Sequence, residues 1–364
     1  MMPPTTFDRP ASPWPRLARR VLVSAAMLAA FSGLIMATFE ALYRMQVVDT
    51  YAPELSAYNP PGDLETTHGR PTALFMGDSF TAGLESYPTL LRSMLPQARI
   101  VNGGISGTGI VQAAIVARER FARFHPKVFV YQIYIGNDLF DITYPVSWGR
   151  VPMLRNVYWI VANYLRSVGF VNYRLAQLGY QLGLLGMDVP DPTATDRPFS
   201  PALYAPRSVL YLRADPRLIE ETALVEGKRA RDFATLIERL RPLLERCAPP
   251  ECTAYVLVIP HCAQVTPEYL QNTRALGAIL EDSATLQMIE YPFVARLRSA
   301  LRDLPNLTVL NPIEALRTSE RLGAPVYHSN DDHLNAAGQH VLAGFLAPPV
   351  ASSLEVPSAT KPTD

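Results

Sequence analysis

Thr72-Ala-Leu-Phe-Met-Gly-Asp-Ser-Phe-Thr81 is the stretch of sequence that decides the fold. Four or five apolar residues ended by a glycine, here Gly77, are typical of a buried strand. Ser79 then stands at the carboxyl end of that strand, where open α/β sheets keep their ligand sites. A serine at such a place becomes a nucleophile only if a base takes its proton and donors receive the developing oxyanion. We therefore looked along the chain for both.

The segments that follow alternate between helix and strand patterns. Residues 98–102 indicate a second strand that runs into a glycine-rich turn at 103–109, and apolar residues then recur at helical spacing to Phe121. Residues 127–135 (KVFVYQIYI) are continuous apolar sequence, as in a parallel strand covered on both faces. This order predicts an α/β fold with a doubly wound parallel sheet, in which the strand ends share one edge.

The rest of the chain completes that pattern around one irregular segment. Residues 139–216 are rich in aromatic residues and lack regular alternation, so we interpret them as a largely helical insertion over the active edge. The predicted elements after it are a helix at 216–246, a strand at 253–260, a helix at 285–302, a strand at 306–310 and a helix at 336–346. The domain thus covers residues 71–347, and a disordered tail is expected at 348–364.

The amino-terminal segment predicts a membrane anchor. Residues 21–39 carry no charge and would span about 28 Å as a helix, close to the thickness of a bilayer core. Three arginines at positions 16, 19 and 20 are expected to keep residues 1–20 in the cytoplasm. In a bacterial inner membrane, this places the domain on the periplasmic side. A cleaved signal peptide is the competing interpretation. Residues 46–70 are expected to be a linker.

Composition excludes two classes of protein. The chain has 364 residues, of which 48% are hydrophobic, so it is globular rather than disordered. Its 33 basic and 33 acidic residues cancel, which argues against a nucleic-acid partner. Cys247 and Cys252 are spaced so that they could form a disulfide in an oxidising compartment, leaving Cys262 unpaired, and three reduced thiols remain the alternative.

Acyl transfer requires an imidazole, an orienting acid and oxyanion donors around the serine. His333 is the candidate base because it lies beside two acids and just before a helix. The candidate donors are the backbone N–H groups of Ser79 and Gly104 and the side-chain amide of Asn137. We also considered Ser106 as an alternative nucleophile, and His328 and His340 as alternative bases.

Four sequence blocks carry a resemblance to a known family. They are Gly77-Asp78-Ser79-Phe80, Asn102-Gly103-Gly104-Ile105-Ser106-Gly107, Gly136-Asn137-Asp138 and Asp331-Asp332-His333-Leu334-Asn335. In this order they resemble the blocks of the SGNH (GDSL-type) hydrolases, over roughly residues 70–350. The resemblance implies a flavodoxin-like three-layer α/β/α sandwich and ester or acyl-transfer chemistry carried by Ser79, Gly104, Asn137 and His333.

Two positions depart from the family pattern. The family often has a glycine two residues before the asparagine, where this chain has Ile135. Its acid usually stands three residues before the histidine, at a position occupied here by Asn330. Asp331 gives instead a D-x-H form that resembles periplasmic polysaccharide acetyltransferase-like members. We therefore expect Asp331 to orient His333, with Asp332 as the alternative.

The sequence thus predicts a serine-dependent esterase or acetyltransferase that needs no cofactor. Its predicted partners are an acylated small molecule, glycan or lipid and the membrane. His328, Asp331, Asp332 and His333 also suggest a metal site, but residues adjacent in sequence rarely converge on one ion, so no metal is expected. The alternative function is a non-catalytic glycan-binding or scaffolding protein of an envelope polysaccharide machine.

Overall fold

A computed structural model describes residues 14–47, 49–65, 69–181 and 195–355. Its centre is a five-stranded parallel sheet in the order β2-β1-β3-β4-β5. The strands are β1 (Thr72–Met76), β2 (Arg99–Asn102), β3 (Val128–Tyr134), β4 (Thr253–Ile259) and β5 (Leu307–Leu310). This order is that of flavodoxin-like sheets, so the predicted α/β class with a parallel sheet is confirmed.

Alternate side chains of each strand enter two separate cores. Leu74 of β1 and Val256 of β4 pack into one core, while Phe75 and Leu257, their neighbours in sequence, pack into the other. Successive residues of a strand point to opposite faces, so a strand buried on both faces needs continuous apolar sequence. The sheet is therefore the middle layer of a three-layer α/β/α sandwich.

Helices cover the two faces in separate groups. One layer contains α4 (Tyr87–Met94), α15 (Ile313–Arg321) and α16 (Ala336–Leu354). The other contains α5 (Ile110–Phe124), α10 (Leu218–Leu224), α11 (Arg229–Leu244) and α14 (Pro292–Ala300). Shorter helices are α6 (Asp138–Ile142), α12 (Pro267–Ala275), α13 (Ser283–Leu286) and a 3-10 turn η1 (Cys262–Gln264).

Four predicted segments differ from the structure. The segment expected to be a linker folds as α2 (Ala52–Tyr58) and α3 (Pro61–Leu64), because the buried side chains of Tyr51 and Leu55 join the core. The tail expected from residue 348 is helical to Leu354, because α16 buries Val350 and Leu354 despite two prolines. Each of the helices predicted at 216–246 and 285–302 is two helices.

Other terminal expectations lie outside the described part of the chain. They are residues 1–13 of the predicted cytoplasmic segment and residues 356–364 of the predicted tail. The pairing of cysteines, which the sequence left open, is a disulfide between Cys247 and Cys252, and Cys262 is a buried free thiol.

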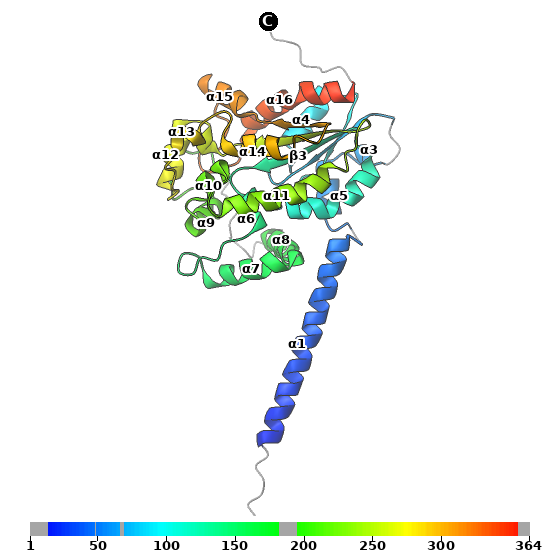
Figure 1. Cartoon of the computed structure of the whole chain (residues 1–364), viewed down its shortest axis with the longest axis vertical. Helices are drawn as coiled ribbons and strands as arrows, with labels where there is room; N and C mark the ends of the chain where they lie inside the picture. The colour runs from blue at the N-terminus through cyan, green and yellow to red at the C-terminus, as the bar shows by residue number, and fades with distance from the viewer. Residues whose placement is uncertain (1–13, 48, 66–68, 182–194, 356–364) are drawn as a thin grey trace, which may run out of the picture.

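The insertion packs beneath the sheet edge and beside the amino-terminal helix (Figure 1). Its helices are α7 (Met153–Tyr164), α8 (Arg166–Gln181) and α9 (Pro206–Ala214), and residues 182–194 lie outside the described residues. Helix α1 (Trp14–Met45) projects away from the domain, and its segment Ala18–Met45 is long and apolar enough to cross a membrane. A signal sequence would meet the same criterion.

Candidate active site

Ser79 lies in a tight turn that follows β1. The backbone N–H groups of Thr81 and Ala82 donate to the carbonyl of Asp78, at 3.2 and 2.9 Å. Gln132, a buried polar residue of β3, accepts from the backbone N–H of Asp78 at 3.1 Å and from the hydroxyl of Thr81 at 3.0 Å. A neighbouring strand thus fixes both sides of the serine, whose side chain is half-buried.

His333 and Asp331 complete a hydrogen-bonded chain with this serine. Ser79 Oγ lies 2.8 Å from Nε2 of His333, and Nδ1 of His333 lies 2.6 Å from Oδ1 of Asp331. With a neutral imidazole, the hydroxyl donates to Nε2 and Nδ1–H donates to the carboxylate. The backbone N–H of His333 also donates to Oδ1 of Asp331. The structure therefore brings together the predicted nucleophile, base and acid, although they are up to 254 residues apart.

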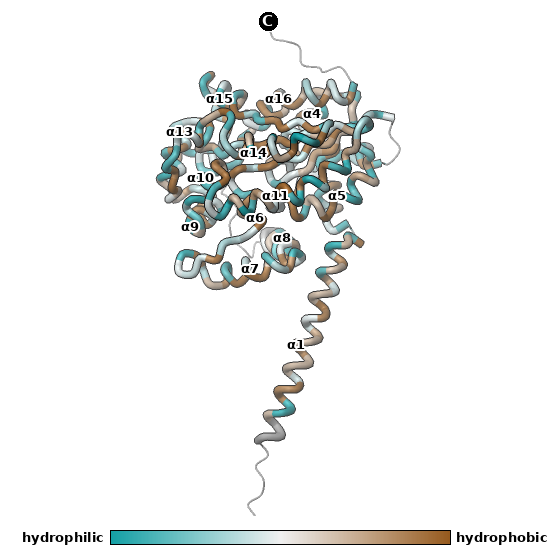
Figure 2. The backbone as a smooth tube through the Cα atoms, viewed as in Figure 1, coloured by the Kyte–Doolittle hydropathy of each residue, from teal (hydrophilic) through white to brown (hydrophobic). Residues whose placement is uncertain are grey.

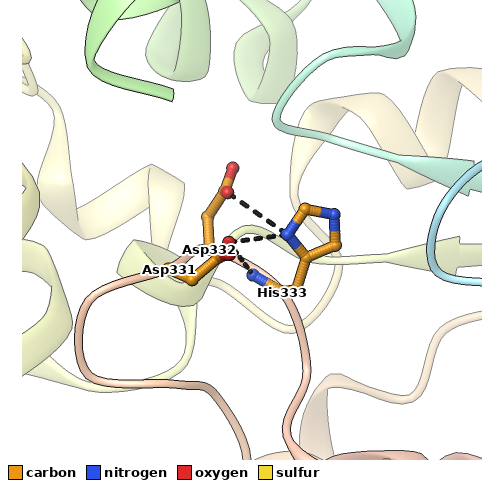
Figure 3. Close-up of side chains that lie close together, drawn as sticks. All are labelled: Asp331, Asp332 and His333. Carbon is orange, nitrogen blue, oxygen red and sulfur yellow. Dashed lines mark hydrogen bonds and ion pairs between the residues drawn. The ribbon is translucent and has the colours of Figure 1, made fainter. Parts of the chain in front are cut away.

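Asp332 holds a different position beside the histidine (Figure 3). Its Oδ1 lies 3.8 Å from Nδ1 of His333, which is too far for a hydrogen bond. Its carboxylate instead accepts from the hydroxyl of Ser208 at 2.7 Å and from that of Tyr134 at 3.1 Å. Of the two acids that the sequence left as candidates, Asp331 has the geometry of an orienting partner.

The charges of this group shift its pKa values in opposite directions. Partial burial lowers the pKa of His333, but the carboxylates of Asp331 and Asp332 outweigh burial and raise it to about 9. Burial raises the pKa of Asp331, but the positive charge of His333 and its hydrogen bonds outweigh burial and bring it to about 2. The pair is therefore arranged to stabilise an imidazolium, the species that forms when the imidazole takes the proton of serine.

The three expected oxyanion donors differ in their present partners. Among the described residues, neither the backbone N–H of Ser79 nor the amide nitrogen of Asn137 has a hydrogen-bond acceptor. The N–H of Gly104, in contrast, donates to Oδ1 of Asn102 at 3.0 Å. A side chain at position 104 would lie 2.5 Å from the backbone nitrogen of Ala82, so close packing alone requires this glycine. Gly104 is thus not a free donor in this structure.

Asn330 occupies the position, three residues before His333, at which the SGNH pattern usually has its acid. Its side chain is fully buried, donates to the carbonyls of Arg197 and Pro198 at 2.9 and 3.3 Å, and accepts from the N–H of Ser200 at 2.8 Å. The asparagine therefore ties the insertion to the loop that carries His333. An aspartate here would lose the two donated hydrogen bonds and leave a charge buried.

The alternative nucleophile and bases have other surroundings. Ser106 lies in the loop after β2 and lines a cavity described below. His328 contacts Asp196, with 2.7 Å between Nδ1 and Oδ1, and His340 Nδ1 lies 2.8 Å from the carbonyl of Ala336 in its own helix. None of these residues makes a hydrogen bond with Ser79 within the described part of the chain.

A second group of acids lies buried behind the rim. Burial raises the pKa of Asp78 to about 6 and that of Asp141 to about 7, and it raises the pKa of Asp138 well above its ordinary value. Asp78 and Asp138 each keep one carboxylate oxygen without a partner among the described residues, and Asp141 keeps both. The unpaired Oδ1 of Asn137 is also buried. This part of the rim is therefore less satisfied than the serine–histidine part.

A cavity of about 270 Å³ opens between the loop after β2 and the insertion. Arg207 of α9 reaches into it, and its Nε donates to the hydroxyl of Tyr211 at 2.8 Å. The guanidinium also lies close to Gly107. A Cβ atom at position 107 would be only 3.2 Å from Nη1 of Arg207. The aromatic lining consists of Tyr51, Tyr144, Tyr158, Trp159, Tyr173 and Tyr211. The next residue of the helix, Ser208, contacts Asp332, so the cavity lies beside the candidate site.

Sequence reasoning missed the residues that support the site. Gln132 is the only side-chain amide in the apolar run of β3, and this break in an apolar strand is the signal that could have identified it. No comparable signal marks Arg207 and Ser208, because they belong to an insertion whose fold was not predicted in detail. Tyr134, in the apolar run of β3, also lacks such a signal. Asp331, Asp332 and His333 offer ligand atoms within 4.8 Å of one another, but their carboxylates already bind His333, Ser208 and Tyr134.

The chain matches no family model and no curated protein. It is similar in structure to an acetylxylan esterase from Geobacillus stearothermophilus, with 12% identity over 81% of this chain and 99% of that one and a TM-score of 0.38. It is also similar to an alpha/beta hydrolase enzyme from the metagenome of Lake Arreo, Spain, with 14% identity over 82% of this chain and 100% of that one and a TM-score of 0.35. Neither likeness is close enough to assign an activity.

Proposed function

We propose that this protein is an SGNH-type ester hydrolase or acyltransferase that uses Ser79 as its nucleophile. The observation that carries the proposal is the hydrogen-bonded chain from Ser79 Oγ through His333 to Asp331, with distances of 2.8 and 2.6 Å. Capping or turn formation would explain a serine after a strand, but neither explains a buried carboxylate aligned behind an imidazole.

The proposed reaction has two steps. Ser79 Oγ attacks the acyl carbonyl while His333 Nε2 takes the hydroxyl proton, and His333 then returns that proton to the leaving alcohol. This leaves an acyl group on Ser79. Water or a sugar hydroxyl then attacks the acyl-enzyme, with His333 again as base, and Ser79 is released. Hydrolase and transferase differ only in this second acceptor.

The oxyanion would bind to N–H donors of the rim that have no acceptor within the described part of the chain. The backbone N–H of Ser79 and the amide nitrogen of Asn137 have no acceptor among the described residues, so both can bind the oxyanion without breaking an existing bond. Gly104 contributes a third N–H only if Asn102 releases it, because that N–H now donates to the Asn102 side chain.

The aromatic cavity beside the site is the proposed place for the rest of the substrate. The half-buried rings of Tyr144 and Tyr158 can stack on sugar rings, and Arg207 can bind ring hydroxyls or an acidic substituent. Acylated glycans, small molecules and lipid esters all remain within the proposed substrate class, and no nucleic acid is included.

We further propose that α1 is a retained inner-membrane anchor with the domain in the periplasm. Three arginines precede its apolar run, and such residues stay in the cytoplasm. Glu40 and Tyr43, near the end of α1, are buried against the domain, so cleavage after Tyr43 would remove packing that the domain uses. A phosphatase fused after residue 50 should be active outside the cytoplasm, and an inactive fusion would contradict this topology.

The test of the reaction uses the full chain in detergent with p-nitrophenyl acetate as substrate. The wild-type protein should release p-nitrophenol, and Ser79→Ala should not exceed the buffer rate. A serine-directed phosphonate should label the wild type, and peptide mapping should find the adduct on Ser79. Equal turnover by the two proteins would contradict the proposed reaction, and an adduct at Ser106 would replace the nucleophile.

A further inference from the structure

Exposed apolar side chains gather on one part of the domain. Among the described residues, nine of the sixteen large exposed apolar side chains outside α1 fall between residues 146 and 178. The nine are Val146, Trp148, Met153, Leu154, Val157, Tyr164, Val171, Leu175 and Leu178. We call this set the insertion surface. An apolar patch of this kind on a soluble face normally marks an interaction site.

Each helix of the insertion presents its apolar residues on one side. On α7, Met153, Leu154 and Val157 are exposed, while Asn156 and Trp159 are buried against the domain. On α8, Val171, Leu175 and Leu178 recur at steps of four and three residues, which places them on one face. The exposed side chains are therefore not scattered. They form the outer faces of two amphipathic helices.

Contacts with α1 fix the depth of these helices relative to the apolar run. The run ends at Phe39, and the carboxylate of Glu40 accepts from the backbone N–H groups of Arg166 and Ser167 at 3.0 and 2.8 Å. These N–H groups begin α8, and Tyr43 stacks on Phe170 one turn further, with ring centroids 5.5 Å apart. The junction of α7 and α8 therefore lies level with the end of the apolar run.

The direction of α7 follows from the same view. In Figure 1, α7 lies on the side of the domain from which α1 leaves, with α8 between the two helices. In Figure 2, α7 carries brown apolar segments, as does α1. A bilayer crossed by residues 21–39 would thus have its surface at the level of α7.

The charge of residues 146–178 indicates which partner the insertion surface binds. Residues 146–178 contain four arginines, at positions 150, 155, 166 and 174, and no aspartate or glutamate. Arg174 is paired with Glu54, so the positive charge comes from the other three. Exposed tryptophan and tyrosine, which Trp148 and Tyr164 supply, are enriched where membrane and water meet. An amphipathic helix with an apolar face and basic flanks binds the headgroup region of anionic bilayers.

We propose that the insertion surface lies in the headgroup layer of the bilayer that α1 crosses. The domain is then held against the membrane at two places, by the anchor and by the outer faces of α7 and α8. Both helices also line the 270 Å³ cavity beside Ser106 and Gly107, so this docking brings that cavity to the membrane surface. The inference depends on the proposed anchoring of α1, but it does not depend on the proposed reaction.

Quenching by lipid-borne nitroxide tests the docking in the full chain. The variants Leu28→Cys, Leu154→Cys, Val157→Cys and Leu322→Cys each carry an environment-sensitive fluorophore, and each protein is reconstituted in phosphatidylglycerol-containing vesicles. Leu28 reports the anchor, and Leu322 of the α15 end is the matched control, because it is 81% exposed but lies on the opposite side of the domain. The unsubstituted chain gives the background from Cys262, which is buried.

Nitroxide at headgroup depth should quench labels at 154 and 157 at least threefold more than the label at 322. Nitroxide on the acyl chain should quench the label at 28, which lies near the middle of the apolar run. Quenching at 28 together with equal values at 154 and 322 would overturn the docking while leaving the anchor in place. Absence of quenching at 28 would overturn the anchor and the docking with it. Signals at 154 and 157 that change with protein density, but not with nitroxide lipid, would assign the surface to a second copy of the chain and overturn the proposal.

Discussion

Two parts of one rim differ in how completely their polar atoms are paired. On the base side, Ser79, His333 and Asp331 are joined in one chain of hydrogen bonds, and Asp332 has two hydroxyl donors. On the oxyanion side, the backbone N–H of Ser79 and the amide nitrogen of Asn137 have no acceptor among the described residues. The comparison suggests that the base side is formed before substrate binds, whereas the oxyanion side is completed by substrate or water.

The largest expected effect is on the base side. Ser79→Ala removes the only atom proposed to bond the acyl group, so kcat should fall by roughly 10⁴-fold or more, to the level of binding and oxyanion stabilisation alone. Steady-state hydrolysis of an acetyl ester measures this. The thermal midpoint should stay within a few degrees, because the hydroxyl is half-buried. A fall below about tenfold would mean that another residue is the nucleophile.

The next largest effect should distinguish the two neighbouring acids, Asp331 and Asp332. Asp331→Asn leaves the shape intact but removes the carboxylate 2.6 Å from Nδ1, so kcat should fall by about 10³- to 10⁴-fold. Asp332→Asn is the matched control. Its carboxylate lies 3.8 Å away and binds Ser208 and Tyr134, so the loss should stay within about tenfold. The reverse order of the two losses would assign the orienting role to Asp332.

A smaller effect is expected on the oxyanion side. Asn137→Ala removes one proposed donor, so kcat should fall by about 10²- to 10³-fold with KM little changed. Its stability should not fall, because the Asn137 side chain makes no hydrogen bond with a described residue and leaves one buried oxygen unsatisfied. Kinetics and thermal unfolding of the same preparation measure both. A loss of stability together with activity would indicate a structural role.

The same contrast explains what the sequence could predict. Strands β1 and β3 are continuous apolar runs that end at glycine, so their period and length alone located the sheet, and the four blocks then located Ser79, Asn137 and His333. The sequence could name Asp331 as the orienting acid but could not exclude Asp332. Only the conformation of the loop places Oδ1 of Asp331 2.6 Å, and Oδ1 of Asp332 3.8 Å, from Nδ1 of His333.

Other features depended on long-range packing that leaves no local pattern. Asn102, not the oxyanion, holds the N–H of Gly104, and Tyr51 and Leu55 turn a predicted linker into packed helices. Pro348 and Pro349 ended the predicted helix, yet the buried side chains beyond them continue α16 to Leu354. In each case tertiary packing outweighs the local propensity that the prediction used.

The smallest expected effect is a pH dependence that also begins at the base side. His333 must be neutral to take the proton, and the carboxylates of Asp331 and Asp332 raise its pKa to about 9. The value of kcat/KM should therefore rise about tenfold between pH 8 and pH 10 and level off above that. Asp332→Asn removes one raising charge and keeps the Nδ1 partner, so its midpoint should shift to lower pH. An unshifted midpoint would mean that another group controls the profile.

Stability should change in the opposite direction over the same range. Because the folded-state pKa of His333 is raised, its ion pair with Asp331 stabilises the protein fully below the unfolded pKa of about 6.5, and this contribution is lost as pH rises through about 9. Thermal unfolding should therefore show the wild type losing stability between pH 7 and pH 10. His333→Gln should lose less over this interval, because it carries no charge to lose. The site would then be most active where its base side is least stabilising, because the carboxylates that stabilise the imidazolium in the transition state also stabilise it in the resting enzyme.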